Sequence, residues 1–126
     1  MKGRGVLLRP SIIGGEGMIV SLDEMKKYLR VDYNEEDGLI EQFISSAEKM
    51  CVDVARLSSE QWEVIDSETE ETEEYSKEEL ECIRATIRVA ILYAAGYLFE
   101  HREEADHHAL LLTLRSMLFA IREGVV

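Results

Sequence analysis

Proline is nearly absent from this 126-residue chain, in which Pro10 is the single example. Proline interrupts helices because it lacks a backbone N–H and its ring clashes with the preceding turn. From Val20 onward, only short polar stretches separate segments with a helical pattern. Aromatic residues are also few, at 7% of the chain. The composition therefore predicts a single, small, all-α domain.

Basic residues are outnumbered: the chain has 14 Lys and Arg against 26 Asp and Glu, for a formal net charge of −12. Nucleic-acid phosphates and anionic membrane surfaces are both bound through Lys and Arg, so the charge argues against either as a tightly bound partner. No apolar run reaches the ~18 residues needed to span a bilayer, and no membrane contact is predicted. The basic and then apolar N-terminus superficially resembles a signal peptide. However, Arg9 and Pro10 break its apolar run and no A-x-A cleavage pattern follows.

The sequence also lacks the short motifs that mark common catalytic sites. It contains no G-x-S-x-G, no glycine-rich phosphate loop and no C-x-x-C. Its two cysteines, Cys51 and Cys82, occupy apolar helical positions and are predicted to be buried, reduced thiols, although a disulfide between two helices is geometrically possible. We therefore predict that the protein is not an enzyme, with no catalytic residues, no cofactor and no metal.

The longest run with a helical period covers residues 82–104. Its apolar residues recur every three or four positions and so share one face of a helix: Ile83, Ile87, Ala90, Ile91, Ala94 and Leu98. Ser76 and Glu79 form an S-x-x-E capping box at its start. Gly96 costs about 1 kcal/mol relative to alanine in mid-helix, which predicts that another helix packs closely there. This segment is predicted to be the central helix of a bundle.

Similar patterns predict four helices in total, near residues 21–30, 36–57, 77–102 and 106–123, with the last two antiparallel. A second capping box, Ser21 with Glu24, opens the first helix. The predicted fold is a small four-helix bundle formed by one domain, residues 18–126, preceded by a flexible arm or extension at residues 1–17. The following residues are predicted to be buried: Ile87, Ala94, Leu98, Phe43, Ala47 and Leu114.

A long acidic surface loop is predicted between the second and third helices. Residues 58–75 carry eight carboxylates and no basic residue. Such a stretch buries too little apolar surface to order itself, so residues 66–75 are predicted to be mobile. Residues 61–65 are compatible with a short strand or turn. The loop either serves only for solvation, or provides a negative surface that repels DNA or meets a basic partner.

Two groups of polar residues resemble metal sites. The segment with Asp32, Asn34, Glu36 and Gly38 resembles a calcium loop, but its glycine is one position late and its final carboxylate is missing. We interpret it as acidic residues at a helix start.

His101, His107 and His108 lie near acidic residues, but their spacing matches no closed zinc site. They are interpreted as surface histidines at a helix junction. Glu78, Glu79 and Glu81 are likewise interpreted as a solvated helix start rather than as catalytic acids.

Four stretches of the chain resemble a known family. Residues 20–32 read V-S-L-D-E-M-K-K-Y-L-R-V-D, and residues 37–47 fit D-x-L-I-x-x-x-I-x-x-A. An alanine-rich helix then ends at Phe99 and is followed by E-H-R-E, and residues 114–122 form the closing segment. In order and spacing, residues 18–122 resemble the head–tail connector proteins of long-tailed phages, also called head-completion or DNA-packaging adaptors.

The resemblance implies a structural virion adaptor at the virion neck, made in the bacterial cytoplasm during assembly. Such a protein forms a homo-oligomeric ring under the portal protein, extends the DNA channel, and offers a platform to a neck or tail-completion protein. DNA would pass through without specific binding. The alternative is a small acidic helical interaction protein, such as a DNA-mimic inhibitor or an antitoxin-like binder.

Overall fold

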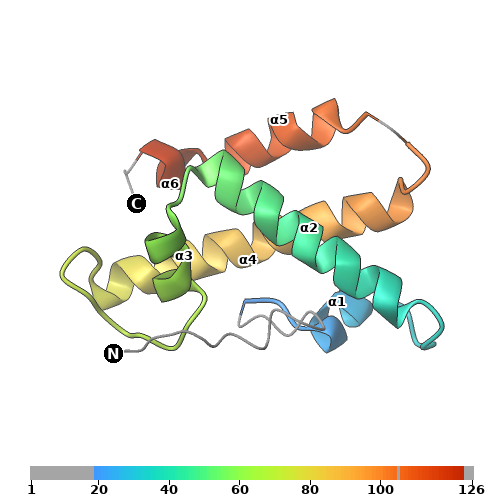
Figure 1. Ribbon diagram of the computed structural model, residues 1–126, viewed down its shortest axis with the longest axis horizontal. Helices are drawn as coiled ribbons and strands as arrows, with labels where there is room; N and C mark the ends of the chain where they lie inside the picture. The colour runs from blue at the N-terminus through green and yellow to red at the C-terminus, as the bar shows by residue number, and fades with distance from the viewer. Residues whose placement is uncertain (1–18, 105, 124–126) are drawn as a thin grey trace.

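The computed structural model describes residues 19–104 and 106–123, and these ranges are helical without any strand. Figure 1 shows the arrangement of the helices. In chain order they are α1 (Leu22–Leu29), α2 (Asp37–Ala55), α3 (Ser59–Ile65), α4 (Lys77–Glu100), α5 (His108–Met117) and α6 (Phe119–Glu123). The predicted all-α class is confirmed, but the two described ranges contain six helices rather than four. The predicted arm at residues 1–17 lies outside the described residues.

The central helix is α4, as predicted. It contacts α1, α2, α3 and α5. In Figure 1, α2 crosses α4, and α5 runs back along α4 in the opposite direction. A Cβ atom built on Gly96 would lie 2.8 Å from Cε2 of Tyr28 in α1. The glycine therefore permits the close helix approach that its mid-helix position predicts.

Serine residues cap three of the helices. The Ser76 hydroxyl accepts a hydrogen bond from the Glu79 N–H at 3.1 Å, and the Glu79 carboxylate accepts one from the Ser76 N–H at 2.8 Å. Ser21 and Glu24 form the same reciprocal pair. Each capping box satisfies two backbone N–H groups that a helix start leaves without an intrahelical partner. Both capping boxes expected from the sequence are confirmed.

The third serine cap, Ser58, corrects the prediction for residues 58–65. Its hydroxyl accepts from the Gln61 N–H at 3.1 Å, while the Gln61 side chain accepts from the Ser58 N–H at 2.9 Å. This S-x-x-Q capping box opens α3, where a loop with a short strand or turn was expected. Ile65, at the end of α3, is fully buried and anchors the short helix on the core.

The predicted last helix is divided into two. Leu118 takes a non-helical backbone conformation, with φ −104° and ψ 10°, and separates α5 from α6. The division leaves both Leu118 and Ile121 buried. The helix begins at His108, two residues after the expected Asp106.

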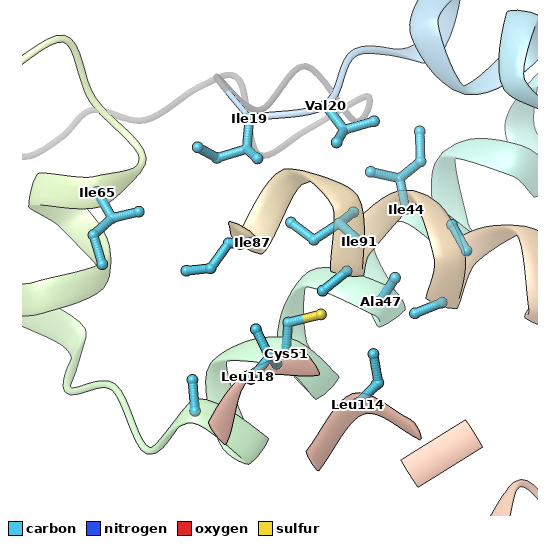
Figure 2. Packing of buried hydrophobic residues seen from close by; sticks show 14 of the residues in the cluster. Ile19, Val20, Ile44, Ala47, Cys51, Ile65, Ile87, Ile91, Leu114 and Leu118 are labelled. Carbon is cyan, nitrogen blue, oxygen red and sulfur yellow. The ribbon is translucent and has the colours of Figure 1, made fainter. Parts of the chain in front are cut away.

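The core lies between α4 and the helices around it. Figure 2 shows Ile19 and Val20 on one side of α4, next to Ile87 and Ile91, with Leu114 on the other side. The predicted core residues are buried except for Phe43. Phe43 is half-buried, and its ring meets that of Phe99 edge-on, with the centroids 6.3 Å apart.

Both cysteines are free, but only Cys51 is buried. Burial raises the pKa of the Cys51 thiol to about 12 because the thiolate would lose its hydration. The prediction that Cys82 is buried is wrong. Leu80 and Ile83 set the core-facing side of α4, and helix geometry turns Cys82 away from it.

Candidate interaction surfaces

The negative charge is concentrated at one end of the molecule. Residues 58–81 contain eleven carboxylates and one lysine, so they carry ten of the twelve net negative charges. We call these residues the acidic end. It consists of α3, the connecting loop and the first turn of α4, which lie together at the left of Figure 1. Most of its carboxylates are exposed to solvent.

One arginine of α4 joins the acidic end to the rest of the protein. The Arg84 guanidinium donates from Nε to the Ile65 carbonyl at 2.8 Å and from Nη2 to the carbonyls of Val64 at 2.9 Å and Thr69 at 2.6 Å. Carbonyls at a helix C-terminus lack intrahelical partners and carry partial negative charge, so a cation stabilises this end of α3. Residues 64–69 are therefore tied to α4, which disagrees with the inference that this stretch cannot order itself.

The second half of the loop is closed by contacts of its own. The Thr72 N–H donates to the Tyr75 carbonyl at 2.8 Å, and the Tyr75 N–H donates to the Thr72 hydroxyl at 3.0 Å. The Gln61 amide of α3 donates to the Glu74 carboxylate at 2.9 Å. Burial, and then the neighbouring Glu74 charge, raise the pKa of the half-buried Tyr75. These contacts fold the loop back on itself while the remaining glutamates stay in solvent.

Two apolar strips lie on the surface of the described part of the chain. The α4 stripe consists of Cys82, Ala85 and Val89, with Glu78 and Glu81 at its N-terminal end, and all five residues are exposed. The α5–α6 stripe consists of Leu111, Leu112, Arg115, Ser116 and Phe119, which are also exposed. Within each strip the spacing of the residues places them on the outward side of the helix.

Helix α4 is long and apolar enough to cross a membrane by length and composition alone, because an 18-residue window within it has a mean hydropathy of 1.4. This differs from the expectation that no apolar run is long enough. Only 44% of the window is buried. Its buried side packs against four other helices, as expected of the central helix of a bundle. Its exposed apolar side is the α4 stripe.

Cationic side chains occupy the segment that resembles a calcium loop. The Lys26 ammonium lies 2.7 Å from Asn34 Oδ1 and 2.7 Å from Asp37 Oδ1. Glu36 accepts a hydrogen bond from the Tyr33 hydroxyl at 3.0 Å, which raises the pKa of that phenol. Arg102 follows the end of α4, and its guanidinium lies 3.5 Å from the carboxylate of Glu36, which is in the connection between α1 and α2. This arrangement joins helix ends through ion pairs.

The three histidines do not converge on a common point. His101 stacks on the Tyr97 ring with the centroids 4.0 Å apart, and His107 meets the same ring edge-on at 6.1 Å. His108 is exposed, and its backbone N–H donates a hydrogen bond to the Asp106 carboxylate at 2.9 Å, so Asp106 helps to cap α5. Within residues 19–104 and 106–123, no group of histidines, cysteines and carboxylates is arranged to hold a metal ion.

The glutamates at the start of α4 are also far from a catalytic arrangement. Glu79 is engaged in the capping box with Ser76, whereas Glu78 and Glu81 point into solvent. Sequence reasoning missed the anchoring contacts of Arg84 and the position of Arg115 as an exposed cation in a segment without carboxylates. Arg84 is 15 to 20 residues from its partners in the chain, so no local pattern marks its role. Arg115 was detectable, because the sequence between residues 107 and 122 contains no carboxylate.

Comparison with known proteins relates the chain to a protein family. The family model described as "Phage gp6-like head-tail connector protein" matches residues 19–119. No curated protein and no solved structure matches significantly. The matched range includes α1 to α5 entirely and stops at the first residue of α6.

Proposed function

The chain belongs to the phage gp6-like head-tail connector family, and from this premise we propose that it forms a ring under the portal, extends the DNA channel and joins head to tail. The family supports the role of a phage structural adaptor. The finer proposal adds a location at the virion neck after assembly in the bacterial cytoplasm. It also names two protein partners, the portal and a neck or tail-completion protein.

The observation that carries the proposal is the placement of charge. Ten of twelve net negative charges lie at the acidic end, and the loop there presents its glutamates to solvent. A ring multiplies this charge around its axis. DNA phosphates would be repelled by such a wall, so that DNA slides without being held. A basic wall would instead bind DNA with a strong dependence on salt.

The loop contacts suit a channel lining because they hold negative charge in a fixed place. Arg84 and the Thr72–Tyr75 pair order the backbone, while the glutamates between them remain exposed. We therefore propose that residues 66–75 face the channel, where DNA passes without specific binding.

We infer that the role of this protein is structural rather than catalytic. Within the described chain, the carboxylates and histidines considered as catalytic or metal-binding groups serve as helix caps, ion-pair partners, ring contacts or solvated side chains. An adaptor acts by holding other proteins in position. It depends on surfaces that recognise the portal, the next tail component and neighbouring copies.

A genetic experiment tests the proposal and separates it from the alternative of an acidic inhibitor or antitoxin-like binder. The gene is deleted from its phage or prophage, and particles from the lysate are examined by electron microscopy. We expect heads and tails to accumulate separately, and a plasmid copy of the gene to restore joined virions. Normal numbers of joined, infectious virions from the deletion would refute the adaptor role.

A further inference from the structure

The α5–α6 stripe is an apolar surface with a positive charge in its middle. Leu111, Leu112 and Phe119 are 38%, 48% and 55% exposed, and Arg115 lies between them along the helix. Arg115 makes no ion pair within the described ranges of the chain. Residues 107–122 contain no carboxylate at all, in a protein whose net charge is −12. Such a surface favours a partner that is apolar and negatively charged.

The α4 stripe has the matching character. Val89 is 54% exposed, and Cys82 and Ala85 continue its apolar surface toward the start of the helix. Glu81 and Glu78 follow on the same side, about two and three turns before Val89. The neighbouring Arg88 is ion-paired with Glu24 of α1. The charge of the α4 stripe therefore comes from its glutamates.

We propose that the α5–α6 stripe of one copy packs on the α4 stripe of a second copy. Leucine and phenylalanine side chains would cover Cys82, Ala85 and Val89, while Arg115 would meet Glu78 or Glu81. The occupant is a second copy of this chain because the chain itself presents the complementary strip. This inference rests on the proposed function, which requires contacts between copies in a ring.

The proposed contact joins two different surfaces, so it is heterologous. After the first contact, one copy keeps its α4 stripe free and the other keeps its α5–α6 stripe free, so further copies can add at both ends in the same way. Such contacts close into a ring when the rotation between neighbours permits. The contact uses the start of α4 and leaves the loop glutamates free, so the same ring can present them to the channel.

Disulfide trapping tests the contact because the α4 stripe already carries an exposed cysteine. Ser116→Cys places a second thiol in the α5–α6 stripe, and Cys51 stays unreactive because it is buried. The full-length variant is oxidised at high concentration and analysed on a non-reducing gel. Ser46→Cys, at an exposed position of α2, is the matched control, and the unchanged chain is the second control.

The proposed contact predicts a ladder of dimers, trimers and larger species for Ser116→Cys, because each copy forms bonds through two different surfaces. The unchanged chain has one accessible thiol and stops at dimers. If Ser116→Cys gives no species above those of the Ser46→Cys control, the proposal is overturned. A ring seen by electron microscopy without a ladder would overturn this contact and leave the proposed function standing. A ladder from a chain that fails to bind its portal would count against the proposed function instead.

Charge reversal provides an independent measurement. Arg115→Glu should reduce self-association at least tenfold, and adding Glu78→Arg and Glu81→Arg in the same chain should restore it, because each contact would again pair opposite charges. Lys49→Glu, at an exposed position of α2, makes the same change in net charge outside both strips. Equal losses from Arg115→Glu and Lys49→Glu would show that only net charge matters and would reject the contact.

Discussion

Replacing Arg84 with alanine should release α3 and the adjoining part of the acidic loop from α4. In the native protein, the guanidinium of Arg84 donates hydrogen bonds to the carbonyls of Ile65 and Val64, at 2.8 and 2.9 Å, and of Thr69, at 2.6 Å. Alanine provides no donor at this position. The Ile65 carbonyl would then have to open toward water to be satisfied, whereas the Val64 carbonyl would keep the hydrogen bond that the Ser67 hydroxyl donates at 2.6 Å.

The size of the expected effect depends on how far each of the three hydrogen bonds is buried. A hydrogen bond to a charged group contributes about 1.5–3 kcal/mol. The two bonds to the end of α3 are half-buried, whereas the Thr69 bond is exposed and contributes less. Taking the lower value for the two half-buried bonds, local opening becomes easier by about 3 kcal/mol. That change corresponds to an opening equilibrium about 100-fold larger.

Amide hydrogen exchange followed by mass spectrometry measures this opening directly. Peptides covering residues 59–69 of Arg84→Ala should exchange about 100-fold faster than in the unchanged protein, while peptides from the centre of α4 should change little. Arg88→Ala is the matched control, because it removes the same charge from the same helix but breaks only the surface ion pair with Glu24. Unchanged exchange in residues 59–69 of Arg84→Ala would refute the anchoring role.

Three further predictions concern the core, the thiols and assembly. Ile87→Ala removes a fully buried side chain and should lower the free energy of unfolding by about 2–5 kcal/mol in a denaturant titration. Val89→Ala, at an exposed position, should change this free energy by less than about 0.5 kcal/mol. Equal effects of the two substitutions would contradict the assigned core. At pH 8, in protein dilute enough to be monomeric, a thiol reagent should modify Cys82 alone, and it should also modify Cys51 once the protein is denatured. Burial raises the pKa of Cys51 to about 12. The buried thiol therefore contributes fully to the free energy of unfolding below its unfolded pKa of about 8.5, and this contribution is lost as the pH rises toward 12. Rapid modification of both thiols in the native protein would contradict the burial of Cys51. Self-association, followed by sedimentation velocity, should strengthen as salt shortens the Debye length from ~30 to ~8 Å, because the screened repulsion between copies that each carry −12 outweighs the weakening of the Arg115 ion pair; weaker association at higher salt would contradict this balance.

The helices with the clearest periodicity could be predicted from sequence. The serine caps and apolar spacing located the starts of α1 and α4, and the class of the fold followed from them. The same signal was present for α3, since Ser58 and Gln61 form an S-x-x-Q capping box. It was overlooked because the surrounding carboxylates suggested a solvated loop. The acidic composition is an average over residues 58–75, whereas the Ser58 cap and the buried Ile65 determine that α3 is helical.

Other features depended on tertiary contacts that no local pattern contains. Arg84 reaches carbonyls 15 to 20 residues away, and only the folded chain brings them together. Phe43 has the spacing of a core residue, yet it lies at the edge of the core beside Phe99. The exposure of Cys82 follows from which side of α4 the other helices cover. The candidate strips were visible in part, because the run of adjacent leucines at residues 110–112 requires one of them to face away from the core.

The measurement that tests the central claim most directly is electron microscopy of the purified protein mixed with the portal from the same phage. Negative-stain images of the portal alone and of the mixture should differ by an added ring on the portal axis, with an open channel through both. Sedimentation velocity of the same samples should show the portal and this protein moving together. A portal unchanged in its images, with this protein sedimenting as a separate monomer at high concentration and high salt, would contradict the adaptor role.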